Sequence, residues 1–251
     1  MNTPGAAFPA NHQQKPGFSR LSNASRPRTL GEVNPPLEAA PEHAPEPRLP
    51  ILFPDALHDL RGHAVAELRY PAAAALIVAG VPGAGKSTAL RKFFDADAAA
   101  TAPSRSPAGV LVLDSMQARN RWRPKLRWLP YLLWRPVVHA AHFLAIRAAL
   151  RAGGPVVIHD CATFRWARTL IARWAAHREL HLLLLDVPAP VARAGQHSRG
   201  RRINRVAFRL HVRGWGRLMS VVATGPAGSG VRSVVIADRA TVDHLRCVTF
   251  A

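Results

Sequence analysis

An apolar run followed at once by a glycine-rich loop is the feature that most limits how this chain can fold. Residues 72–79 read Ala-Ala-Ala-Ala-Leu-Ile-Val-Ala, and residues 80–88 read Gly-Val-Pro-Gly-Ala-Gly-Lys-Ser-Thr. The second run fits the pattern G-x-x-x-x-G-K-[ST], in which a loop joins a buried strand to a helix and wraps around phosphate groups. The sequence therefore predicts a phosphate-binding loop, or P-loop, between a strand and a helix.

The pattern gives particular residues particular chemistry. Glycines let backbone N–H groups and the helix N-terminus face an anion. We expect Lys86 to reach the β- and γ-phosphates of a nucleoside triphosphate, and the Ser87 hydroxyl to complete the shell of a Mg²⁺ ion. The alternative is a glycine-rich turn with a solvated lysine. The predicted nucleotide-binding residues are Gly80, Val81, Pro82, Gly83, Ala84, Gly85, Lys86, Ser87 and Thr88.

Length and composition indicate one domain and a tail. The 251 residues suit an α/β domain of about 200 residues, which we expect at 51–251, after a disordered Pro/Ala-rich tail at 1–50. Cys161 and Cys247 are the only cysteines, so we expect no disulfide framework or zinc site and a reduced, cytoplasmic location. No apolar stretch approaches the roughly 20 residues of a membrane span, so we expect no transmembrane segment.

The formal net charge of +19 comes almost entirely from arginine. Such a field attracts anions, including nucleotides, nucleic acid and acidic lipid. Arginine could equally serve as the general surface cation of this chain, so charge alone does not identify a nucleic-acid partner.

Short apolar segments alternate with helical ones after the tail. This alternation predicts an α/β fold with a five-stranded, mainly parallel sheet and helices on both faces. The predicted strands are 74–79, 110–113, 156–159, 181–186 and 233–237. The predicted helices are 55–70, 86–94, 137–151, 163–177, 190–221 and one that starts near Thr241.

Ligands of open parallel sheets lie beyond the carboxyl ends of the strands, so polar residues there are candidates. Asp160 ends the run Val-Val-Ile-His-Asp and could hold Mg²⁺ or its water. Asp114 ends the second predicted strand and could act as a general base on an attacking hydroxyl. Each aspartate could instead simply cap a helix or a turn.

An arginine-rich segment at about 190–217 is the expected lid. Arg199 and Arg201 are our candidates for clamping a transferred phosphoryl group, although most arginines here could be a solvated helix face. The basic stretch 119–136 holds Trp122, Trp128 and Trp134. These tryptophans could cover the core, stack on bases, or contact an anionic membrane surface. We interpret His139, His142 and His159 as ordinary packed or exposed histidines.

Together these motifs resemble the small P-loop kinases, in particular polynucleotide-kinase-like and zeta-toxin-like ATP-binding proteins. The resemblance spans about residues 74–240 and rests on the P-loop, Asp114, Asp160-Cys-Ala-Thr and the later Arg-Gly-Arg-Arg run. It implies ATP and Mg²⁺ at the P-loop, Asp114 as the substrate-activating aspartate, and residues 238–241 near the adenine. Two positions depart from the family pattern: Asp160-Cys-Ala-Thr lacks an asparagine, and Ser115 stands where many relatives are acidic.

The sequence thus predicts a kinase that transfers the γ-phosphate of ATP to a hydroxyl of an unidentified acceptor, a small molecule or a nucleic-acid end. The alternative is an ATP-binding regulatory or nucleic-acid-associated module that phosphorylates no acceptor.

Overall fold

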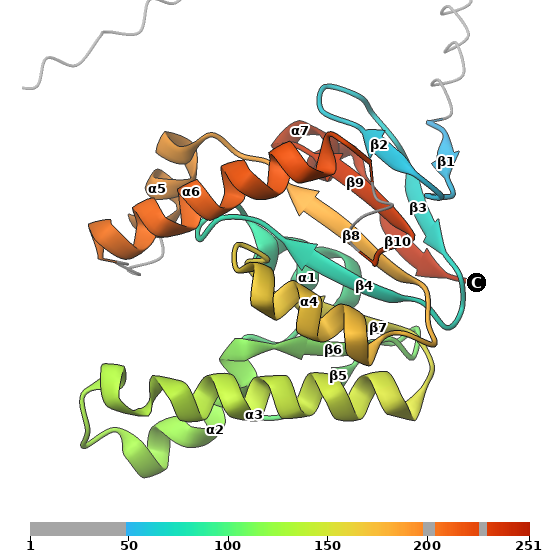
Figure 1. The fold of residues 1–251 in the computed structure, drawn as a ribbon. Helices are drawn as coiled ribbons and strands as arrows, with labels where there is room; N and C mark the ends of the chain where they lie inside the picture. Colours follow the sequence, from blue (N-terminus) through green and yellow to red (C-terminus); the bar gives the residue numbers. More distant parts are fainter. Residues whose placement is uncertain (1–48, 198–203, 226–229) are drawn as a thin grey trace, which may run out of the picture. The chain divides into compact units, whose positions relative to one another are not determined.

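The P-loop strand lies in the middle of a large, mainly parallel sheet. In the computed structural model, which describes residues 49–197, 204–225 and 230–251, this sheet has seven strands in the order β2-β9-β8-β4-β7-β6-β5 (Figure 1). Only β5 runs antiparallel to its neighbour. The strands are β2 (Leu57–Asp59), β4 (Ala75–Ala79), β5 (Ser104–Arg105), β6 (Leu111–Asp114), β7 (Val156–His159), β8 (Leu180–Leu185) and β9 (Ser233–Ala237).

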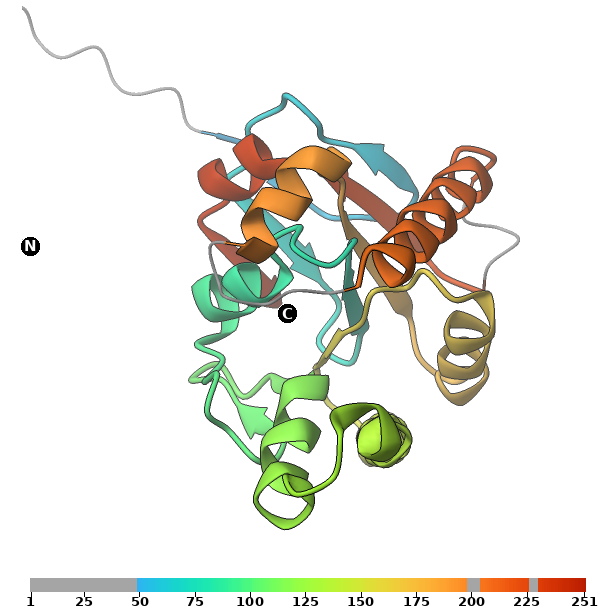
Figure 2. The same cartoon turned by 90° about the vertical axis from the view of Figure 1, so that its left-hand side faces the viewer.

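The central strands are apolar because both faces of the sheet are covered. Every residue of β4, β8 and β9 is buried, as expected for parallel strands between helical layers. Figure 2 shows α1 and α7 on one side of the sheet and α4 and α6 on the other. The helices are α1 (Lys86–Phe94), α2 (Ser115–Leu126), α3 (Tyr131–Ala152), α4 (Arg165–Trp174), α5 (Ala189–His197), α6 (Arg205–Val222) and α7 (Arg239–His244).

The five predicted strands and the two-sided helical cover are therefore confirmed, and β2 and β5 extend the sheet at its edges. A second parallel sheet joins β1 (Ile51–Leu52), β3 (Glu67–Tyr70) and β10 (Cys247–Phe250). Tyr70 links it to the large sheet, because its ring lies 4.9 Å from the His181 ring of β8.

The helix predicted at 55–70 was wrong. Strands β2 and β3 occupy this segment, and the turn between them contains Gly62 at φ +74°. Leu68 and Tyr70 are both 1% exposed and are two residues apart, which is the period of a strand. The wider spacing of Leu57, Leu60 and Val65 only resembled a helical period.

Two other predicted helices have clearly different limits. The helix expected at 137–151 begins six residues earlier, at Tyr131, and α2 covers residues 119–126 of the basic stretch 119–136. The segment expected as one helix at 190–221 contains α5 and α6, and residues 198–203 between them lie outside the described part. The tail predicted at 1–50 also falls almost wholly outside it.

Helix α6 packs closely on the loop after β7, and this contact can be tested. A Cβ added to Gly214 would lie 2.6 Å from the Thr163 carbonyl oxygen, whereas one added to Gly216 would meet nothing within 4 Å. We expect Gly214→Ala to lower the free energy of unfolding by roughly 1–3 kcal/mol through overpacking. Gly216→Ala, the matched control, should raise it by up to about 1 kcal/mol because alanine favours a helix. Urea unfolding measures both values, and equal stabilities of the two variants would contradict the close contact.

Candidate functional site

Parallel strand register brings the carboxyl ends of the central strands to one edge of the sheet. Asp114 of β6 lies opposite His159 of β7, and the N–H of Asp160 donates to the Val78 carbonyl of β4 at 3.3 Å. An aspartate lies at or directly after the end of each of five strands: Asp59, Asp114, Asp160, Asp186 and Asp238. The predicted candidates therefore lie on neighbouring strand ends, with Asp160 next to the P-loop strand and Asp114 one strand further away.

The loop itself has the geometry of a phosphate cradle. Gly83 and Gly85 have φ values of +92° and +103°, which side-chain-bearing residues rarely adopt. A Cβ on Gly80 would lie 2.9 Å from the Leu185 carbonyl oxygen, so the loop passes close to the end of β8. Helix α1 then begins at Lys86 without a side-chain cap. Its first N–H groups therefore suit an anion at this end.

The ammonium group of Lys86 is buried in the loop. Lys86 is 6% exposed, and its Nζ donates to the carbonyl oxygens of Gly80 at 2.7 Å and Val81 at 3.1 Å. Among the described residues no carboxylate lies within ion-pair distance of this nitrogen. A buried charge without a counterion is unfavourable, so the loop fits an anionic ligand such as a polyphosphate.

Asp114 contacts three residues: Met116, Gln117 and His159. It caps α2, because its Oδ1 accepts from Met116 N at 2.9 Å while the Gln117 side chain accepts from Asp114 N at 3.0 Å. His159 Nδ1 lies 2.7 Å from the same carboxylate oxygen. Burial raises the pKa of Asp114, but the neighbouring His159 and the hydrogen bond from the Met116 N–H outweigh it and hold the pKa below its ordinary value. Asp114 is therefore ionised at neutral pH.

Asp160 and Ser87 have the chemistry to hold Mg²⁺ together with phosphate oxygens. Within the described residues no group of three or more His, Cys, Asp or Glu side chains could hold a metal ion. Magnesium commonly takes one or two protein oxygens and completes its shell with substrate phosphates and water. A carboxylate after β7 and a hydroxyl in the first turn of α1 fit that requirement. Asp160 also fixes its own turn, since its Oδ1 accepts from Ala162 N at 2.6 Å.

Helix α5, the first part of the predicted lid, packs directly on the P-loop. A Cβ on Gly83 would lie 2.0 Å from the Ala192 carbonyl oxygen, and one on Gly195 would lie 2.8 Å from the Gly83 carbonyl oxygen. Gln196 Nε2 also donates to the Pro82 carbonyl at 2.8 Å. The lid candidates Arg199 and Arg201 follow this helix and lie outside the described residues, so their role stays a prediction.

Two basic side chains near Asp160, those of Arg168 and His211, were missed by the sequence analysis. Arg168 of α4 donates to the Ala162 carbonyl, and His211 of α6 lies 2.8 Å from the Thr163 hydroxyl. Burial lowers the pKa of His211 to about 4, the charges of Lys86 and Arg135 add to this, and Asp160 opposes it. These residues lie far apart along the chain, on α3, α4 and α6. Their spacing in the sequence therefore does not predict that they lie near one another.

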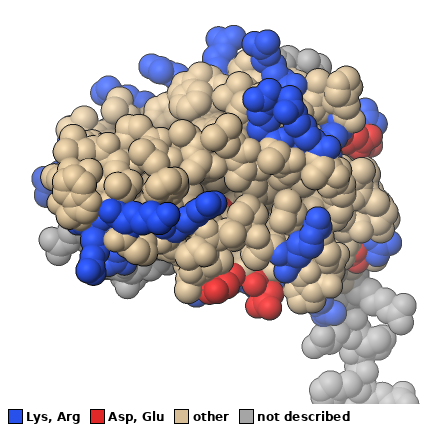
Figure 3. Space-filling view, turned by 90° about the horizontal axis from the view of Figure 1, so that it is seen from below, with Lys and Arg blue, Asp and Glu red and all other residues tan. Residues whose placement is uncertain are grey.

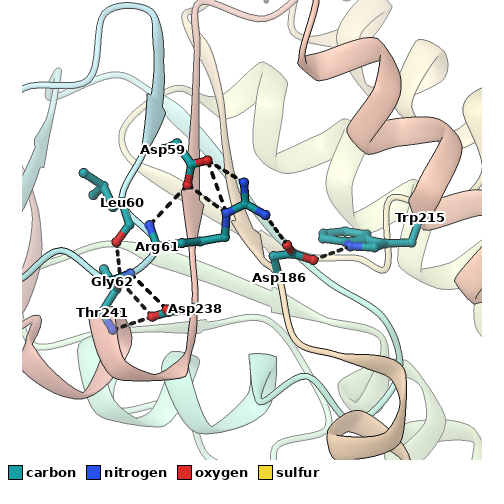
Figure 4. A network of polar contacts seen from close by, with 8 residues as sticks. All are labelled: Asp59, Leu60, Arg61, Gly62, Asp186, Trp215, Asp238 and Thr241. Atoms are coloured by element: carbon teal, nitrogen blue, oxygen red, sulfur yellow. Dashed lines mark hydrogen bonds and ion pairs between the residues drawn. The ribbon is translucent and has the colours of Figure 1, made fainter.

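The aspartates at the other half of the edge have a structural role. Figure 4 shows Arg61 between Asp59 and Asp186, with Nη1 2.9 Å from Asp186 Oδ2, and Trp215 Nε1 donating to Asp186 Oδ1 at 3.0 Å. Asp238 accepts from the backbone N–H groups of Gly62 and Thr241. The aspartates in this half of the edge are thus hydrogen-bonded within the protein. The sequence analysis did not predict the role of Arg61.

The P-loop strand between β7 and β8, the glycine-rich loop and the buried lysine together define a P-loop NTPase fold. A family comparison agrees with this class: the model of the AAA domain family matches residues 76–224. The match covers more than half of the chain and includes the P-loop, Asp114 and Asp160, so the chain belongs to the AAA domain family. No curated protein matches the chain. No helix in the described ranges is long and apolar enough to cross a membrane.

The low pKa of His211 predicts a pH-dependent stability. An unfolded histidine has a pKa of about 6.5, so between that value and about 4 the unfolded chain binds a proton that the folded chain does not. Stability from neutral His211 is complete above pH 6.5 and is lost as the pH falls. We expect His211→Gln to remove about 1–2 kcal/mol of the loss between pH 7 and pH 5, after allowance for partial exposure.

Urea unfolding at the two pH values measures this difference. Exposed His177 offers a matched control, since His177→Gln should leave the pH dependence as in the wild type. The same pH dependence in His211→Gln and wild type would show that burial of neutral His211 does not set it.

Proposed function

We propose that this protein is an ATP-dependent phosphotransferase that moves the γ-phosphate of ATP, with Mg²⁺, to a hydroxyl group of an acceptor. The observation that carries the proposal is the presence of a buried cation and an ionised carboxylate at the same edge of the sheet. Buried Lys86 has no carboxylate within ion-pair distance among the described residues, and ionised Asp114 lies two strands away, paired with His159. A cation for phosphate and a base for a hydroxyl are the two groups that phosphoryl transfer needs.

The donor side of the reaction involves the loop and its neighbours. Lys86 would exchange the Gly80 and Val81 carbonyl oxygens for the β- and γ-phosphates, and the N–H groups at the start of α1 would bind further phosphate oxygens. Ser87 and Asp160 would hold Mg²⁺, which neutralises charge on the phosphates when bound.

The acceptor side would depend on Asp114. Its carboxylate would orient the attacking hydroxyl and accept its proton, while His159 holds the carboxylate in place. A low pKa makes Asp114 a weak base, but positioning and charge stabilisation supply most of the catalysis in phosphoryl transfer. Arg199 and Arg201 remain our candidates for the phosphoryl clamp, and Arg168, which interacts with Asp160, is a further candidate among the described residues.

The resemblance to polynucleotide-kinase-like and zeta-toxin-like proteins supports a hydroxyl acceptor, either a small molecule or a nucleic-acid end. A cytoplasmic location, where ATP is available, suits this reaction. The competing proposal is an ATP-binding regulatory or nucleic-acid-associated module, which the net charge of +19 favours. The two proposals differ in whether any acceptor speeds ATP turnover.

A screen with labelled ATP tests the proposal, using nucleosides, polynucleotide 5′ ends, amino-sugars and antibiotics as acceptors. We expect one class to accept label and to stimulate turnover. Asp114→Asn should lower this stimulated rate by roughly 10²–10⁴-fold while ATP binding persists, because asparagine still caps α2. Asp243→Asn, a change of an exposed aspartate on α7, is the matched control and should leave the rate unchanged.

Two results would count against the proposal. An unchanged stimulated rate in Asp114→Asn would remove Asp114 as the base. ATP binding without label transfer to any acceptor class would favour the regulatory module.

A further inference from the structure

The turn between α2 and α3 exposes large apolar side chains. These helices form a hairpin at one end of the sheet, below it in Figure 1. At its turn Trp128 and Leu132 are each 75% exposed, more than any other large apolar side chain in the described ranges, and Leu133 is 64% exposed. Of the three tryptophans in this stretch, Trp134 is instead buried and Trp122 is half-buried.

The exposed apolar surface continues along α3. Leu133, Val137 and Leu144 lie four and seven residues apart, which places them on one face of the helix, and they are 64%, 38% and 64% exposed. The opposite face is buried through Trp134, Val138, His142 and Ile146. The first turns of α3 are thus apolar on two faces, of which only one packs against the protein.

Every exposed charged side chain of this hairpin is cationic. The chain contains no Asp or Glu between Asp114 and Asp160. Figure 3, seen from the side on which α3 lies in Figure 1, shows Lys and Arg around broad uncharged surface, with Asp and Glu in a few small patches at the lower and right-hand margins. The exposed cations are Arg121, Arg123, Lys125, Arg127, Arg135, Arg147 and Arg151. Two copies of this surface facing each other would repel, so its partner carries negative charge.

Charge and apolar character together select among anionic partners. Nucleic acid would attract the arginines, but exposed leucines and valine gain little from phosphates or base edges. A bilayer with acidic lipids offers anionic headgroups above hydrocarbon, which suits leucines at a tip, an interfacial tryptophan and flanking arginines. We infer that the hairpin formed by α2 and α3 docks on an anionic lipid surface, with Trp128, Leu132 and Leu133 entering the headgroup boundary.

Vesicle flotation of the full chain tests this inference. We expect binding to phosphatidylcholine vesicles that contain phosphatidylserine and little binding to phosphatidylcholine alone. The double variant Leu132→Gln/Leu133→Gln should bind at least about tenfold more weakly, because two buried apolar side chains are lost. The matched control is Val206→Gln/Leu210→Gln on α6, where the side chains are 63% and 54% exposed; it should bind like the wild type.

A second pair of variants tests the charge. Arg123→Gln/Arg127→Gln should weaken binding at least about tenfold, and added salt should weaken wild-type binding. Arg91→Gln/Arg173→Gln removes two exposed arginines from other helices and should change binding little. Circular dichroism checks that each variant is folded.

The inference fails if the chain does not float with anionic vesicles. It also fails if the leucine variant binds like the wild type, because binding would then be electrostatic adsorption alone. Binding to a single-stranded oligonucleotide without vesicle binding would identify nucleic acid as the partner instead.

Discussion

The close approach of the P-loop backbone to its neighbours is the constraint on which the site depends. Gly80 passes the end of β8, and Gly83 passes the carbonyl of Ala192 in α5, at distances that leave no room for a Cβ atom. These contacts fix the loop between β4 and α1 from two sides. Because the loop is held in this way, its N–H groups are positioned before a nucleotide arrives.

The aspartates in the two halves of the sheet edge around this loop have different kinds of partner. On the β8 and β9 side, Arg61, Trp215 and backbone N–H groups engage Asp186 and Asp238. On the β6 and β7 side, Asp114 and Asp160 lie near Lys86, Arg168 and a set of histidines. The first set stabilises the arrangement of the strand ends. The second set has the charges that phosphoryl transfer would use, and α2 begins beside it.

The central fold could be predicted from sequence because its signals are local. Continuous apolar strands and the P-loop pattern need no tertiary information, and Asp114 and Asp160 followed from their places at strand ends. The segment 55–70 could not be predicted, since its strands depend on partners far along the chain, β9 for β2 and β10 for β3. The contact between Asp114 and His159 depends on the register of β6 against β7, which sequence spacing does not specify.

A crystal structure with Mg²⁺ and a non-hydrolysable ATP analogue tests the central claim most directly, namely that residues 80–88 bind the phosphates of a nucleotide. We predict the β- and γ-phosphates against the N–H groups at the start of α1. Lys86 Nζ should have left the Gly80 carbonyl oxygen, now 2.7 Å away, for a phosphate oxygen. A nucleotide bound elsewhere, with Lys86 still on the loop carbonyls, would contradict the account.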